Sequence, residues 1–89
     1  MMNNVKVFDT HVRTKDGRYL HFDVLIDSND PELAKAYARR FLDEQGVQEE
    51  DISQNECRFC HVEPTNPVVT EAISQQGHFI IKLQGCQES

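Results

Sequence analysis

The stretch FDTHVRTKDGRYLHFDV, from Phe8 to Val24, is nearly symmetrical about its centre and constrains the fold more than any other feature of the chain. Apolar and β-branched residues recur on both sides of Lys15-Asp16-Gly17, which is typical of two strands joined by a tight turn. A three-residue loop with Gly17 in a left-handed bulge position pairs Thr14 with Arg18. We therefore expect a β-hairpin formed by residues 5–14 and 18–27.

The register of this hairpin decides which side chains share a face of the sheet. The three-residue loop sets Val12 opposite Leu20, so apolar residues meet apolar residues. A two-residue loop would instead set Val12 opposite His21 and would mix core and surface at every pair, which makes it the less favourable register. In the preferred register, the face opposite the apolar one carries Asp9, His11, His21 and Asp23.

Three interpretations of this cluster of two carboxylates and two imidazoles remain open. The first is a solvated sheet face, on which hydrogen bonds from the histidines relieve the repulsion between opposed aspartates, about 0.2–1 kcal/mol. The second is a metal or acid–base site, because imidazole and carboxylate ligands suit zinc, iron or manganese. The third is a subunit interface, because apolar residues continue this face. The candidate metal ligands are Asp9, His11, His21 and Asp23, and the candidate paired carboxylates are Asp9, Asp23 and Glu63.

Two helices are predicted by their capping residues. Asp30-Pro31 and Asn66-Pro67 each combine an N-capping side chain with proline at the first helical position. Gly46 and Gly77 then provide the expected ends. The predicted helices cover about residues 31–45 and 67–76, and the two further strands cover about residues 54–63 and 78–84.

This order of elements predicts an α+β two-layer sandwich: a four-stranded mixed sheet with both helices on one face. The helices would cover the face that carries Phe8, Leu20 and Phe22. The other face would then expose three apolar side chains, and we expect it to form a homodimer or to bind a protein partner. These exposed residues are Val7, Leu25 and Ile80.

The stretch ECRFCH, from Glu56 to His61, combines two cysteines and a histidine. Zinc needs four ligands, and Cys57, Cys60 and Cys86 with His61 or His78 would supply them if the chain made a tight knuckle there. Cys-x-x-Cys-His also matches c-type haem attachment, which requires export, and a redox dithiol, which usually requires a helix N-terminus at the motif. The remaining interpretation is that Cys57 or Cys60 packs in the sheet as a small apolar residue.

The chain as a whole predicts one domain, residues 1–89, with an ordinary globular composition. Its net charge of -6 disfavours nucleic acids and anionic membranes as partners, since both require a basic surface. The N-terminal residues do not form a signal peptide, no segment is long enough to span a membrane, and the cysteine count of 3 is odd. We therefore expect a cytoplasmic protein with reduced thiols.

The segments FDTHV, KDGRYLHFDV, ECRFCH and GHFIIKLQGC together resemble a small bacterial family, domain of unknown function family twenty-twenty-four, over about Val5 to Cys86. The resemblance implies a single-domain α+β protein and carries no catalytic residues over. The first functional hypothesis is therefore a non-enzymatic interaction or self-associating module. The alternative is a metal-binding protein that uses either cluster, with zinc as the candidate ion, and a small enzyme acting through the His/Asp face is the third.

Overall fold

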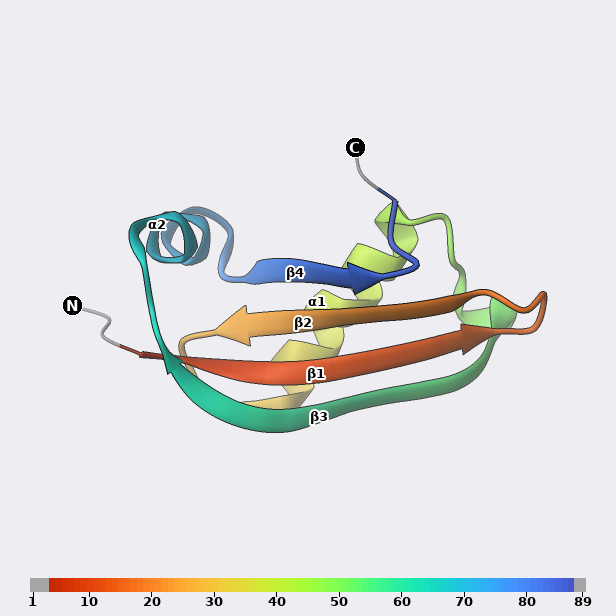
Figure 1. The fold of residues 1–89 in the computed structure, drawn as a ribbon, viewed down its shortest axis with the longest axis horizontal. Helices are drawn as coiled ribbons and strands as arrows, with labels where there is room; N and C mark the ends of the chain where they lie inside the picture. The colour runs from red at the N-terminus through yellow and green to blue at the C-terminus, as the bar shows by residue number, and fades with distance from the viewer. Residues whose placement is uncertain (1–3, 88–89) are drawn as a thin grey trace.

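The computed structural model describes residues 4–87 and contains one sheet and two α-helices (Figure 1). Every predicted helix and strand is present, with ends within two residues of those expected from the sequence. The elements in chain order are β1 (Asn4–Thr14), β2 (Tyr19–Ile26), α1 (Pro31–Glu44), a short 3-10 helix (Glu49–Asp51), β3 (Ile52–Pro64), α2 (Pro67–Gln76) and β4 (Phe79–Gln84).

The hairpin of β1 and β2 has the predicted register. Gly17 has a φ of 93°, a left-handed conformation that side chains rarely adopt, and the backbone N–H of Thr14 donates to the carbonyl of Arg18 at 2.9 Å. Val12 consequently pairs with Leu20, and one face of the hairpin carries the fully buried side chains of Phe8, Val12, Leu20, Phe22 and Val24. On the other face Val7 pairs with Leu25, Asp9 with Asp23 and His11 with His21.

The sheet has the strand order β3-β1-β2-β4, and all its pairings are antiparallel, so the prediction of a mixed sheet was wrong. β3 runs in the direction of β2 but pairs with the far edge of β1, so the two like-directed strands are never neighbours. α2 remains at the end of the sheet where β3 finishes, and β4 therefore runs back along β2 in the opposite direction (Figure 1).

The apolar face of the hairpin is covered by α1. Asp30 caps the helix by accepting hydrogen bonds from the backbone N–H groups of Glu32 and Leu33. The buried residues of α1 recur at helical spacing and meet the even-numbered residues of β1 and β2, with the rings of Phe22 and Phe41 4.6 Å apart. The helical part of this core consists of Ala34, Ala38, Phe41 and Leu42.

The opposite face is partly covered by α2, so the prediction that both helices lie on one face was also wrong. Val69 and Ile73 of α2 pack against Val5, Val7 and Leu25, which belong to the face that carries the histidines. Because α1 already occupies the other face, the apolar stripe of α2 finds its surface at this end of the sheet. Val7 and Leu25, expected to be exposed, are consequently only 1% and 2% exposed.

The parity of β4 also differs from the expectation. Ile80 pairs with Val24 and packs against the α1 core, whereas Phe79 and Ile81 join the α2 cluster. The expected open apolar surface of Val7, Leu25 and Ile80 is therefore not formed, because two of these residues lie under α2 and the third faces α1. Within the described residues, no helix is long and apolar enough to cross a membrane.

Candidate metal centre

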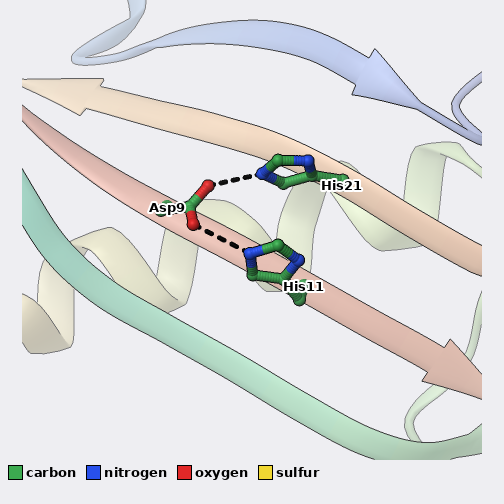
Figure 2. Close-up of side chains that lie close together, drawn as sticks. All are labelled: Asp9, His11 and His21. Atoms are coloured by element: carbon green, nitrogen blue, oxygen red, sulfur yellow. Dashed lines mark hydrogen bonds and ion pairs between the residues drawn. The ribbon is translucent and has the colours of Figure 1, made fainter.

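Asp9, His11 and His21 converge on the part of the sheet face that α2 leaves open (Figure 2). Asp9 and His11 are two residues apart on β1 and therefore point the same way, and the hairpin register sets His21 directly opposite His11. Each imidazole donates its Nε2–H to a different oxygen of Asp9, at 2.8 Å from His11 and 2.6 Å from His21. One carboxylate thus joins both rings, and all three side chains remain about a quarter to a third exposed.

The two imidazole rings are stacked, with centroids 4.1 Å apart and planes inclined by 15°. This contact follows from their position as a directly opposed cross-strand pair. Because the rings are nearly parallel and both direct Nε2 towards Asp9, rotation of either ring is restricted by its neighbour as well as by its hydrogen bond. The cluster is therefore held in one arrangement before any ligand arrives.

Tyr19 extends this cluster, and sequence reasoning had not singled it out. Its hydroxyl lies 2.5 Å from Nδ1 of His11, and the guanidinium of Arg13 lies 4.7 Å from the centre of its ring. The signal that could have revealed it is strand parity, because Tyr19 shares a face of β2 with His21 and pairs with Arg13. A hydrogen-bonded chain consequently runs from Tyr19 through His11 and Asp9 to His21.

The opposed carboxylates of Asp9 and Asp23 titrate differently. Partial burial raises the pKa of Asp23, and its hydrogen bond with Asp9 and the negative charge of Asp9 raise it further, to about 6. For Asp9, partial burial opposes ionisation, but hydrogen bonds with His21, His11 and Asp23 outweigh it and lower the pKa. Asp9 therefore ionises first as the pH rises, and the repulsion between the two carboxylates delays the ionisation of Asp23.

The ligand atoms of Asp9, His11 and His21 lie within 4.8 Å of one another and could hold a metal ion. An ion about 2.1 Å from each atom would require separations of no more than about 4.2 Å, close to the spacing of this cluster. Two imidazoles and one carboxylate form the donor set of open zinc and non-haem iron sites. Asp23, the fourth expected ligand, is not one of the three converging groups, although it pairs with Asp9 across the strands.

A hollow of about 410 Å³ opens beside this cluster and gives solvent access to one side of His11. It has a basic, an acidic and two amide side chains on its walls, so it is polar rather than apolar. Its lining residues are His11, Arg13, Tyr19, Gln54, Asn55 and Glu56. Glu63, the third carboxylate considered for acid–base chemistry, instead accepts a hydrogen bond from Nε2 of His61 at 2.6 Å on β3.

The cysteine–histidine cluster expected from ECRFCH is not brought together. Cys57 and Cys60 lie on β3, and Cys86 follows β4, and these two strands form opposite edges of the sheet. Sγ of Cys86 lies 3.8 Å from the carbonyl oxygen of His21 on β2, and β2 is two strand spacings, about 10 Å, from β3, whereas sulfur ligands of one zinc ion lie within about 5 Å of each other. His61 contacts the neighbouring Cys60, with Nδ1 and Sγ 3.1 Å apart, and both are exposed.

Cys57 behaves as a small core-facing residue. It packs at the edge of the α1 core, and the hydroxyl of Thr10 donates to its sulfur at 3.4 Å. Burial raises the pKa of the Cys57 thiol, which disfavours the reactive thiolate. Cys86 packs against the same core from the opposite edge of the sheet. This arrangement agrees with the interpretation of a packed thiol and not with a redox dithiol.

Comparison with known proteins identifies the family. The model of the family described as Domain of unknown function (DUF2024) matches residues 2–83. The chain belongs to this family. The DUF2024 chain is also similar to the NMR structure of protein NE1680 from Nitrosomonas europaea, a structural genomics target, with 43% sequence identity and a TM-score of 0.78 over 94% of this chain and 99% of that chain. No curated protein matches the DUF2024 chain.

Proposed function

We propose that this domain binds a divalent transition-metal ion through Asp9, His11 and His21. The observation that supports this most directly is the convergence of both Nε2 atoms on the two oxygens of one carboxylate. A bound ion would accept the Nε2 lone pair of each imidazole, and the proton that Nε2 now donates to Asp9 would pass through solvent to Nδ1 of the same ring. Three protein ligands would leave further coordination positions for water or a small molecule.

The surroundings of His11 also support metal binding. Metal-bound histidines usually donate their second ring N–H to a fixed acceptor, which sets the tautomer and the orientation of the ring. Tyr19 provides that acceptor, because its hydroxyl oxygen lies 2.5 Å from Nδ1 of His11. With a metal at Nε2, Nδ1–H would donate to Tyr19, and the Tyr19 hydroxyl could donate onward to water.

The test is equilibrium dialysis of tag-free protein against Zn²⁺ or Co²⁺, followed by elemental analysis of the protein. We expect one bound ion per chain in the wild type, and loss of binding in His11→Ala and in His21→Ala. Circular dichroism would establish that both variants are folded. Bound Co²⁺ would in addition give a visible spectrum that reports its coordination.

His61→Ala is the matched control, because His61 is also a partly exposed histidine hydrogen-bonded to a carboxylate. It belongs to β3, and its imidazole hydrogen-bonds with Glu63 and Cys60 of the same strand. We expect this variant to keep full metal binding. A wild type without stoichiometric metal, or a His61→Ala variant that loses binding as His11→Ala does, would refute the proposed site.

We also propose self-association as a second function, which the exposed edge strand β3 favours. The homodimer expected from the sequence relied on apolar residues of the open sheet face, and these are covered by the helices. β3 offers a different surface, because ten of its 13 residues are exposed at the edge of the sheet. Sedimentation velocity over a range of protein concentrations tests this function, and a monomer at every concentration would refute it.

A further inference from the structure

β3 presents an accessible edge of backbone donors and acceptors. It is the last strand in the order β3-β1-β2-β4, and it runs for 13 residues from Ile52 to Pro64. An edge strand of this length leaves a row of N–H and C=O groups directed away from the sheet, and such a row pairs readily with another strand. The question is which strand fits it.

The regular part of this edge is limited by two irregularities. The β1–β3 register shifts between Val7 and Phe8 and again between Arg13 and Thr14, which leaves Cys60 and Ser53 without a register partner. Between these shifts, residues 54–59 pair without interruption. Six regular residues extend about 20 Å, so regular pairing with an incoming strand is confined to this length.

We propose that β3 pairs antiparallel with β3 of a second copy of the chain, around a two-fold axis at Cys57, to form a continuous eight-stranded sheet. The proposal deepens the second function above by naming its surface and register, and it does not depend on metal binding. A two-fold axis makes the interface isologous, so each contact occurs twice.

Charge selects this register. Centred on Cys57, the pairing sets Glu56 of each copy opposite Arg58 of the other, which gives two cross-strand ion pairs. Centring on Glu56 would oppose two carboxylates, and centring on Arg58 would oppose two guanidinium groups, both of which are unfavourable. Within one chain Glu56 and Arg58 already lie 2.8 Å apart on the same face of β3, and both side chains are more than half exposed.

The other face of β3 supports the same register through Phe59. Its ring contacts Phe8 edge-on, with centroids 5.7 Å apart, yet it remains 48% exposed. In the proposed dimer Phe59 lies opposite Asn55 of the second copy, at the mouth of a groove of about 510 Å³ between α1 and β3. The apolar part of that groove consists of Leu42, Val47, Ile52 and Cys57. Two exposed phenyl rings would thus be covered by one pairing.

The first experiment is a charge swap, followed by sedimentation velocity. Arg58→Glu and Glu56→Arg each place like charges opposite each other twice, and we expect either to weaken dimerisation about tenfold or more. The double variant Glu56→Arg/Arg58→Glu restores both pairs and is expected to restore dimerisation. Rescue by the double variant cannot arise from misfolding of the single variants. Failure of rescue would overturn the register.

The second experiment uses Cys57 as a reporter of the axis. Directly opposed residues of antiparallel strands have Cα atoms about 4.5–5.5 Å apart, which is within the range that a disulfide spans. In a Cys60→Ser/Cys86→Ser background, at an alkaline pH that ionises the partly buried Cys57, its thiolate would attack glutathione disulfide and release glutathione. Cys57 of the second copy would then displace the bound glutathione as a second thiol, and a covalent dimer would form. The Cys57→Ser variant, which retains Cys60, is expected to form no covalent dimer.

The outcomes separate this interface from self-association in general. A strictly monomeric chain would refute both. A dimer could instead be unaffected by the charge variants, give no Cys57 crosslink and dissociate in Leu83→Asp. This result would refute pairing through β3 but would support self-association through another surface. Leu83 is suited to this comparison because it lies on the opposite edge strand and is 51% exposed. A dimer that passes the swap and crosslinking tests would support the proposed pairing.

Discussion

At the scale of single residues, the two opposed carboxylates of the candidate site differ in their hydrogen bonds and in their pKa. Asp9 accepts from both histidines and is the more acidic partner, while Asp23, opposite it on β2, has its pKa raised to about 6. Asp23 contributes stability below its unfolded pKa of about 4 and loses that contribution as the pH rises through about 6. In the absence of a cation, the ionised pair therefore destabilises the fold at neutral pH.

We expect Asp23→Asn to stabilise the metal-free protein at pH 8, by the order of 1 kcal/mol after allowance for solvent screening. The gain should shrink as the pH falls below about 6, where Asp23 of the wild type is protonated. Urea unfolding at pH 8 and at pH 4.5 measures both values. Asp27→Asn, at an exposed position, is the control and should be near neutral at either pH. A gain independent of pH would contradict the assignment.

Tyr19 should affect metal affinity without being a ligand. Tyr19→Phe keeps the ring but removes the hydroxyl that meets Nδ1 of His11, and we expect the affinity for Zn²⁺ to fall about 10-fold to 100-fold. Competition with a chromophoric chelator measures this change. Tyr37→Phe serves as the control, because Tyr37 belongs to α1 on the opposite face of the sheet and stacks on His78. Equal losses in the two variants would argue against a role for Tyr19 in orienting His11.

At the scale of secondary-structure elements, α2 determines how much of the His/Asp face is open. Ile73 is 6% exposed and belongs to the cluster that covers Val7 and Leu25. We expect Ile73→Ala to cost about 2–4 kcal/mol, as buried isoleucines do when truncated. Val68→Ala, on the same helix but 66% exposed, should change stability by less than about 0.5 kcal/mol. Chemical denaturation of both variants makes the comparison.

The segment that follows β4 requires a glycine at Gly85, because its backbone lies against the backbone of the hairpin at Tyr19. Its φ is 73°, and a Cβ there would collide with the backbone carbonyl oxygen of Tyr19. Beyond it, the side chain of Gln45 both donates to the carbonyl of Gln87 and accepts from its N–H. Gly17 also has a positive φ but has open space around it. We therefore expect Gly85→Ala to lower the thermal midpoint clearly more than Gly17→Ala does. Gly17→Ala should lower the free energy of unfolding by about 1 kcal/mol, through backbone strain alone.

The sequence was informative wherever structure is decided locally. Gly17 and the alternation of the flanking strands specified the register, and that register alone assembled Asp9, His11 and His21. The capping side chains of Asp30 and Asn66 accept backbone N–H groups at the predicted helix starts. Strand order and the position of α2 were not predictable in this way, because β3 and β4 select their edges through contacts with residues distant in sequence.

At the scale of the whole molecule, one contact joins elements from the two faces of the sheet. His78, between α2 and β4, stacks on Tyr37 of α1 with ring centroids 4.1 Å apart and is 8% exposed. Burial lowers the pKa of His78. As the pH falls below about 6.5, His78 therefore binds a proton more readily in the unfolded chain than in the folded chain. The free energy of unfolding consequently decreases as the pH falls.

We expect His78→Phe, which keeps an aromatic ring against Tyr37, to weaken the loss of stability between pH 7.5 and about 5. Arg40 of α1 also lowers the pKa of His78 and Glu44 raises it, so their electrostatic effects oppose each other. Thermal unfolding across this range measures the slope for both proteins. An unchanged slope in the variant would assign the acid sensitivity to other groups.

The placement of the N-terminal hairpin at the centre of the sheet has a consequence for synthesis on the ribosome. β1 and β2 emerge first and close through local contacts, a step that takes microseconds in isolated hairpins. Both flanks of this nascent pair then stay uncovered until the later strands arrive, β3 on one side and β4, near the C-terminus, on the other. A nascent chain whose first three strands have left the ribosome before β4 does would therefore leave its β2 flank open to chaperones or to other nascent chains.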